Sequence, residues 1–335
     1  MLPPLVQWKL LFTRLTKEGI YIATLTIEQI AAVSYPAVLA EMRKAANQWA
    51  ESAALRELER QGAVDRISLG ATIECPLDYR ANPDTTVLAS DQDTTSLLKT
   101  EIATAASYDV AQISVPVVWT KGDEAKNPTE SQKISLVKQL LENAVNSHDD
   151  KVEQHLFTSS TAGGDELLGF NTLIPTSGQG TVGGIDAATN TFWRNQANTY
   201  VDSTDIEAAM TTAYNAASKG SGSMLAPKFI ISGSTAHSTF EAQLQSLQRF
   251  VDTSEADAGY KVLAFKNARF VFSQYGDTKI YMLNPQSYKL VVSKQYFRDK
   301  GNTVEIPEQN AFVFKVYSAL QAVTSNKSRL AVVYI

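Results

Sequence analysis

Residues 67–80 read ISLGATIECPLDYR, and every second residue in this stretch is apolar, beginning with Ile67. The same phase holds Leu69, Ile73 and Leu77, whereas the residues between them are mostly polar. Side chains alternate between the two faces of a β-strand. This period of two therefore predicts a long strand with one apolar face.

A second strand is predicted to return beside the first over residues 101–119, where apolar residues again alternate with polar ones. Its phase flips near Ala111 and Gln112, which indicates a β-bulge. Pro76 lacks a backbone donor, so the first strand should lie at a sheet edge. A ribbon of two strands with one apolar face is marginally stable alone in water. Another domain or another subunit is therefore expected to cover it.

Two helices flank this ribbon in the sequence. The first is amphipathic and is predicted to begin at Ser34 and to end at Gly62. The second follows Pro128 and should run to about Leu156, which is longer than the usual globular helix. Its apolar stripe consists of Ile134, Val137, Leu141, Val145, His148, Val152 and Leu156.

The remainder predicts a mixed α/β region and a C-terminal hairpin. A helix is expected after Thr204, which would form a capping box with Glu207, and residues 228–232 read as a buried strand. Strands over 311–323 and 329–335 would pair as the hairpin. A helix starting near Ser234 and short strands at 261–265, 269–272, 280–283 and 289–292 complete the pattern. The fold class is therefore α+β.

Composition excludes several classes of protein. Of the 335 residues, 44% are hydrophobic and 19% are charged, which is typical of a folded chain rather than a disordered one. No apolar run is long enough to span a bilayer. Cys75 is the lone cysteine, so an internal disulfide is impossible. A net charge of −5 argues against a surface that binds nucleic acid tightly. Residues 1–33 are interpreted as an extended arm.

The motifs of enzyme chemistry are weak. Residues 178–183 match G-x-G-x-x-G, but loop-forming residues stand on both sides, where a dinucleotide site needs a strand and a helix. His148 and His155 share a helix face, yet a zinc site needs a third ligand. Ser135 and Lys138 form S-x-x-K without the other parts of that constellation. No catalytic, cofactor or metal site is expected, and the protein is not expected to be an enzyme.

Residues 183–196, GGIDAATNTFWRNQ, carry two adjacent aromatic residues within a polar stretch. Phe192 and Trp193 are followed at once by Arg194. One interpretation is an aromatic plug that pins a loop to the core. The other is a contact between subunits, and the two are compatible.

The order of these parts resembles that of tailed-phage major capsid proteins of the Hong Kong 97 type, over about residues 26–335. The segment 183–196 is similar to a stretch in one subgroup of phage and prophage capsid proteins. The resemblance implies a Hong Kong 97-like capsid fold with these parts: an N-terminal arm (1–33), an amphipathic helix (34–65), an extended loop (66–118), a peripheral domain with its spine helix (119–201, spine 128–159), an axial domain (202–293) and C-terminal strands of the peripheral domain (294–335).

The resemblance also implies a function and partners. The chain would form hexamers and pentamers of an icosahedral shell that encloses double-stranded DNA in a virion assembled in the host cytoplasm. A portal, a decoration or cement protein and a separate scaffolding protein are implied, since no long charged helical segment precedes Ser34. Covalent lysine–asparagine cross-linking between subunits, known in a few relatives, would need a lysine near the tip of the ribbon, and Lys99 is the only candidate there. The expected subunit contacts are Ile67, Leu69, Ile73, Leu77, Lys99, Phe192, Trp193 and Arg194.

Two alternatives remain open at this point. One is an encapsulin-type shell around a cargo enzyme, and the other is a carbohydrate- or host-binding structural protein of a virion. Neither a membrane partner nor a cofactor is expected.

Overall fold

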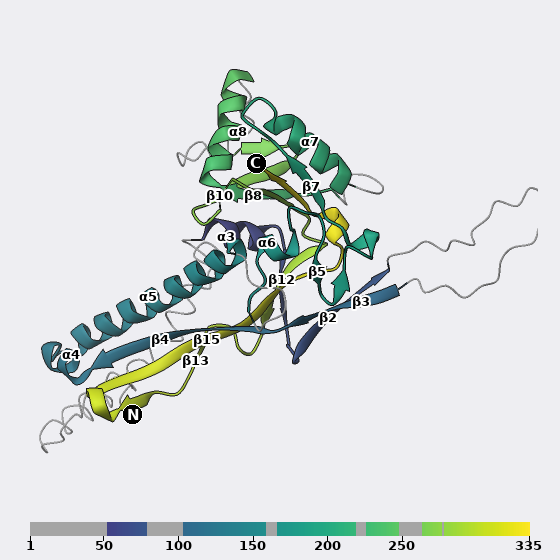
Figure 1. Ribbon diagram of the computed structural model, residues 1–335. Helices are drawn as coiled ribbons and strands as arrows, with labels where there is room; N and C mark the ends of the chain where they lie inside the picture. The colour runs from purple at the N-terminus through teal and green to yellow at the C-terminus, as the bar shows by residue number, and fades with distance from the viewer. Residues whose placement is uncertain (1–51, 79–102, 159–165, 219–225, 248–262, 277) are drawn as a thin grey trace, which may run out of the picture.

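The computed structural model describes residues 52–78, 103–158, 166–218, 226–247, 263–276 and 278–335. These residues form two six-stranded sheets, a two-stranded ribbon and a two-stranded hairpin, together with helices. Figure 1 shows a long arm of helix and sheet on one side of the body and the ribbon on the opposite side. The predicted α+β class is confirmed. The short helical elements are α4 (Lys121–Lys126), α6 (Phe170–Leu173), η1 (Thr191–Trp193), η3 (Pro307–Gln309) and η4 (Lys327–Arg329).

The first six-stranded sheet, which we call the arm sheet, is built on the long strand β15 (Ala311–Thr324). Strand β4 (Ala111–Thr120) runs antiparallel beside it, from the pair Ala311 and Thr120 to the pair Leu320 and Ala111. Three shorter strands, β14 (Val304–Ile306), β13 (Asp299–Lys300) and β12 (Tyr288–Ser293), pair with successive parts of β15. Strand β12 also pairs with β1 (Val64–Ile67).

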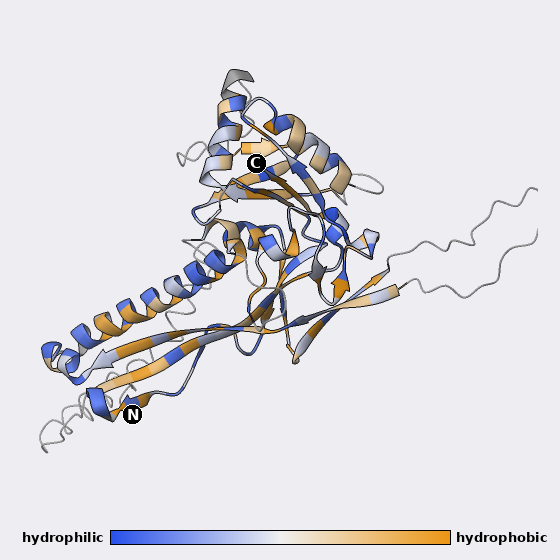
Figure 2. Ribbon diagram, in the orientation of Figure 1, coloured by the Kyte–Doolittle hydropathy of each residue, from blue (hydrophilic) through white to orange (hydrophobic). Residues whose placement is uncertain are grey.

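Helix α5 (Glu130–Phe157) lies along β4 and confirms the predicted long helix. Pro128 precedes it and Thr129 is its N-cap. Figure 2 shows apolar residues in α5 and in β4 and β15. One end of the predicted stripe differs, because Ile134 is 46% exposed. The cluster between helix and sheet consists of Val117, Trp119, Val137, Leu141, Ala144, Phe314 and Val316.

The second six-stranded sheet, the head sheet, has the order β7-β16-β11-β8-β10-β9. Its strand β8 is the predicted buried strand, and alternate side chains of β8 enter two different cores. Ile230 packs in the core with α7 and α8, whereas Phe229 and Ile231 face the central core. The elements are β7 (Gln196–Thr199), α7 (Ile206–Ala217), β8 (Phe229–Gly233), α8 (Ser234–Leu247), β9 (Leu263–Phe265), β10 (Ala268–Ser273), β11 (Ile280–Leu283) and β16 (Ala331–Tyr334).

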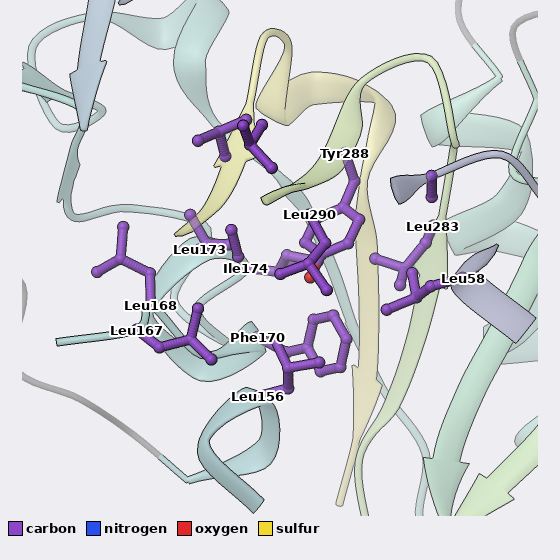
Figure 3. Packing of buried hydrophobic residues seen from close by; sticks show 14 of the residues in the cluster. Leu58, Leu156, Leu167, Leu168, Phe170, Leu173, Ile174, Leu283, Tyr288 and Leu290 are labelled. Carbon is purple, nitrogen blue, oxygen red and sulfur yellow. The ribbon is translucent and has the colours of Figure 1, made fainter. Parts of the chain in front are cut away.

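The central core joins the arm sheet to the head sheet (Figure 3). Helix α3 (Ala53–Arg60) contributes Leu58 to it, and Gly62 ends this helix as predicted. Gly62 has φ +67, and the amide of Ala63 donates to the carbonyl of Leu58, the pattern of a Schellman motif. The part of this predicted helix before residue 52 lies outside the described residues. Around Leu58 the core contains Leu156, Leu167, Leu168, Phe170, Leu173, Ile174, Leu283, Tyr288 and Leu290.

Three sequence predictions about these elements are wrong. The C-terminal strands do not form a hairpin, because β15 belongs to the arm sheet and β16 pairs with β11 and β7 in the head sheet. Thr204 forms no capping box, since its hydroxyl donates to Asp202 and Asp205 is the N-cap of α7. The phase flip near residue 111 marks a change of strand partner rather than a bulge within one ribbon.

Candidate functional site at the root of the ribbon

The ribbon consists of β2 (Thr72–Asp78) and β3 (Ala103–Asp109), which pair in antiparallel register from Thr72 and Asp109 outward. In the part of the chain that the structure describes, β2 pairs with no strand other than β3, in agreement with the edge position expected from Pro76. Within the segment 66–118, β2 and β3 form the ribbon, whereas β1 and β4 belong to the arm sheet. Figure 1 shows it leaving the body beside β5.

One face of the ribbon packs against the chain's own core. Ile73 is 7% exposed, and Ala106 and Tyr108 are also buried there, with Leu69 and Leu77 partly buried beside them. A neighbouring subunit is therefore not needed to cover Ile73. Ile67, by contrast, is 42% exposed at the end of β1. Burial raises the pKa of the Cys75 thiol, so the lone cysteine stays protonated near neutral pH.

Hydrogen bonds hold two consecutive residues at the root of β3. The Ser107 amide donates to the carbonyl of Gly183 at 3.1 Å. The Tyr108 hydroxyl donates to the carbonyl of Thr324 at 2.8 Å and accepts from the amide of the same residue at 3.3 Å. These bonds tie the ribbon to β15 and to the segment around residue 183.

Gln321 completes this attachment at the point where β3 gives way to β4. It is 1% exposed, and its amide nitrogen donates to the carbonyls of Asp109 (2.6 Å) and Glu166 (3.1 Å). Its amide oxygen accepts from the amide of Leu168 at 2.9 Å. The side chain thus satisfies backbone groups left unpaired where the strand changes its partner.

The glycine motif forms a small hairpin instead of a nucleotide site. Strands β5 (Thr181–Val182) and β6 (Ile185–Asp186) pair across a turn at Gly183 and Gly184, which have φ +60 and +78. Positive φ at both central residues is typical of a tight hairpin turn. No helix begins at the last glycine of the motif, so no helix N-terminus is available for a pyrophosphate.

Trp193 anchors this hairpin and Arg194 braces the chain that follows it. Trp193 is 1% exposed, and its indole nitrogen donates to the carbonyl of Val182 at 3.0 Å. The guanidinium of Arg194 donates to the carbonyls of Ala187 and Ala188, each at 2.9 Å. Phe192 is partly buried against the central core. The aromatic-plug interpretation therefore describes Trp193, whereas its contact with another subunit stays a prediction.

A second polar cluster joins α5 to the arm sheet. Arg298 is 1% exposed and has φ +52, and its Nη2 lies 2.5 and 2.6 Å from the two carboxylate oxygens of Asp149. Nδ1 of the fully buried His148 lies 3.0 Å from Asp149 Oδ1. His148 thus lies at a helix contact, as expected, and its partner Asp149 is in turn bound by Arg298, which directly precedes β13.

Glu153 makes a similar junction one turn further along α5. Its carboxylate accepts a hydrogen bond from Ser273 of β10 and, at the start of α3, from Ser52 and the backbone of Ala54. Burial raises the pKa of the Glu153 carboxyl, and the hydrogen bonds oppose that effect. Glu153 therefore links α5 to the head sheet and to α3.

Sequence reasoning missed Arg298, Gln321 and Glu153, because a polar residue within an alternating or helical pattern reads as exposed. Their partners lie far away in the sequence, so no local signal identifies them. Lys99 and the arm at residues 1–33 lie outside the described residues. Among the residues that are described, no group of side chains is arranged to hold a metal ion, and no helix is long and apolar enough to cross a membrane.

No family model and no curated protein matches the sequence, but solved structures share the fold. The capsid asymmetric unit of cyanophage A-1(L) is 17% identical, with a TM-score of 0.58 over 83% of this chain and 92% of that chain. The capsid of Myoviridae phage XM1 is 10% identical, with a TM-score of 0.52 over 83% and 91%. The holo-SrpI encapsulin complex from Synechococcus elongatus PCC 7942 is 13% identical, with a TM-score of 0.53 over 83% and 86%. The chain has the Hong Kong 97-like capsid fold, and the resemblance is confirmed at the level of the fold.

Proposed function

We propose that this chain is the major capsid protein of a tailed bacteriophage or prophage. Copies of it would assemble as hexamers and pentamers into an icosahedral shell around double-stranded DNA. The observation that carries the proposal is the fold itself, which phage capsid structures share over 83% of the chain. In those structures the fold builds a capsid, so the same role is the simplest one for this chain.

The described surface offers apolar positions suited to contact with other subunits. Val118 and Val304 are 45% and 59% exposed, and Val313 lies between them in register across β4, β15 and β14. Side chains paired in register point to the same face of a sheet, here the face away from α5. Ile67 adds an exposed apolar residue near the ribbon. We propose these positions as subunit contacts, together with the ribbon and Phe192.

The proposed shell has no enzymatic role. A separate scaffolding protein, a portal and a decoration or cement protein would be its partners in the virion, which would be assembled in the host cytoplasm. The net charge of −5 supports a lining that encloses DNA without gripping it, since dense phosphate contacts would hinder both packaging and release. The domain boundaries given by the resemblance, at residues 34, 66, 119, 202 and 294, remain part of the proposal.

An encapsulin-type compartment is the second candidate, and the match to the encapsulin complex supports it. The two candidates share the shell but differ in its contents. Nuclease-protected DNA in purified particles favours the phage capsid, whereas a co-purifying cargo protein in place of DNA favours the compartment.

Deleting Asn82–Lys99 and joining the ends with a short glycine turn tests the proposed role of the ribbon. The full chain is expected to sediment as capsomers or shells, whereas the deletion variant should keep the same circular-dichroism spectrum and remain small. The central core that folds the subunit lies outside the deleted segment, which is the reason for this expectation. Shells of normal yield from the deletion variant, or its global unfolding, would contradict the proposal.

A further inference from the structure

We propose that the hairpin of residues 181–186 is a buttress that sets the direction in which the ribbon leaves the body. Gly183 is the positioning residue of this buttress. The inference rests on the proposed shell function for its consequence in assembly, but the contact itself is internal to one chain. It gives a structural role to the glycine motif and to the aromatic pair that follows it.

The turn of the hairpin is in direct contact with the ribbon. A Cβ at Gly183 would lie 2.7 Å from Ala106 Cβ, 3.1 Å from Tyr108 Cζ and 3.2 Å from Tyr108 Oη. The Gly183 carbonyl also accepts the hydrogen bond from the Ser107 amide. The turn therefore touches three neighbouring residues of β3, and only a glycine leaves room for this approach.

The buttress itself is fixed to the body. Trp193 is buried and donates to the carbonyl of Val182 within the hairpin. The amide of Ala187 donates to the carbonyl of Gly180 at 3.2 Å, which closes the base of the hairpin. Because these bonds hold the hairpin, strain at the turn must be relieved largely by the ribbon.

A small displacement at the turn grows along the ribbon, because the ribbon is held at its root. Asp109 is held by Gln321, and Ala106 lies three residues outward, about 10 Å along the strand. Widening the contact from 2.7 Å to an ordinary separation of about 3.4 Å would tilt the strand by about 4° around Asp109. The displacement doubles at Ala103 and grows along the ribbon. A subunit that folds normally would then present its ribbon in the wrong place.

The chain contains a matched control at the neighbouring position. Gly184 also has positive φ, at +78, but a Cβ there would meet nothing within 4 Å. Gly183→Ala and Gly184→Ala therefore carry a similar backbone cost, and only the first presses on the ribbon. Ala106→Gly removes the nearest of the three atoms that the new methyl group would meet, so combining it with Gly183→Ala should relieve most of the pressure.

The experiment compares these four variants with the full-length wild type by two readouts. Hydrogen exchange of the peptide around Ser107 reports the contact in unassembled subunits, and the yield and diameter of particles report assembly. Gly183→Ala should speed exchange at Ser107 at least tenfold and cut particle yield at least fivefold, with global thermal unfolding equal to that of Gly184→Ala. Gly184→Ala should stay within twofold of wild type in both readouts, and the double variant should recover more than half of the yield that Gly183→Ala loses.

Two results would overturn the inference. One is equal loss of yield in the Gly183→Ala and Gly184→Ala variants, which would assign the effect to backbone strain alone. The other is unchanged exchange and yield in Gly183→Ala. If the wild type forms no particles, the proposed function fails, and the exchange comparison still decides whether the hairpin braces the ribbon.

Discussion

Replacing Asp149 by Asn should destabilise the subunit strongly, because it removes the charge that balances a buried guanidinium. Arg298 is 1% exposed and Asp149 is 4% exposed, so water cannot take the place of the lost carboxylate. With the charge centres about 4 Å apart and an effective dielectric constant of about 20, the pair interacts by about 4 kcal/mol. Removing one partner of a buried pair costs about 3–5 kcal/mol, which agrees with this value.

Chemical denaturation of unassembled subunits at pH 7 measures this loss as a change in the free energy of unfolding. Glu142→Gln is the control, since Glu142 pairs with Lys138 on the same helix at 3.6 Å but is 42% exposed. The free energy of unfolding of Glu142→Gln should fall by less than about 0.5 kcal/mol. Replacing both Asp149 by Leu and Arg298 by Met should recover most of the stability. A loss below about 1 kcal/mol in Asp149→Asn would refute the reasoning.

Three further predictions concern titration and DNA. Lys327 is fully buried and its Nζ has no hydrogen-bond partner, and burial lowers its pKa to about 8. The unfolded chain therefore binds more protons than the native state between pH 8 and 10.5. The free energy of unfolding of Lys327→Met should exceed that of wild type by up to about 3 kcal/mol below pH 8. Denaturation curves should show this difference shrinking as the pH rises to 10.5. Burial raises the pKa of Glu153, so the native state binds more protons than the unfolded chain. The free energy of unfolding of wild type relative to Glu153→Gln should therefore fall as the pH rises above about 4.5. A difference in free energy between the two proteins that stays constant in urea titrations from pH 4 to 8 would oppose this. Purified subunits should not retain duplex DNA in a gel-shift experiment at physiological salt, and tight or sequence-selective binding would identify a nucleic-acid binder instead of a container.

Periodic segments could be predicted from the sequence because their burial follows a local repeat. The alternation in 72–78 and the apolar stripe of α5 both satisfy this condition, and the strands β8 and β11 lie where expected. Gly62 was identifiable as a helix end because a Schellman motif needs positive φ at that position.

Strand partners could not be predicted, because the periodicity of a strand does not say which sheet it joins. Strand β15 and strand β16 are close in sequence, yet η4 carries the chain from the arm sheet to the head sheet between them. The burial of polar residues such as Arg298 could not be predicted for a related reason. Arg298 is balanced by Asp149, and the two lie 149 residues apart in the chain.

The candidate site was predicted in part. The ribbon and Trp193 were identified, and cover by another domain was one of the two alternatives expected for the ribbon. The segment that contacts it was not identified, because the glycine hairpin that touches Ala106 lies some 75 residues further along. A motif with several glycines can serve a phosphate, a flexible loop or a close backbone approach, and the sequence does not distinguish them. The spatial neighbours of Gly183 decide in favour of close approach.

Electron microscopy of the purified full-length protein, at concentrations of tens of micromolar, tests the central claim most directly. The proposed function predicts capsomers with fivefold or sixfold symmetry, or closed hollow shells built from both. Subunits that remain monomers or dimers throughout this range, or that assemble into open filaments without fivefold vertices, would contradict it.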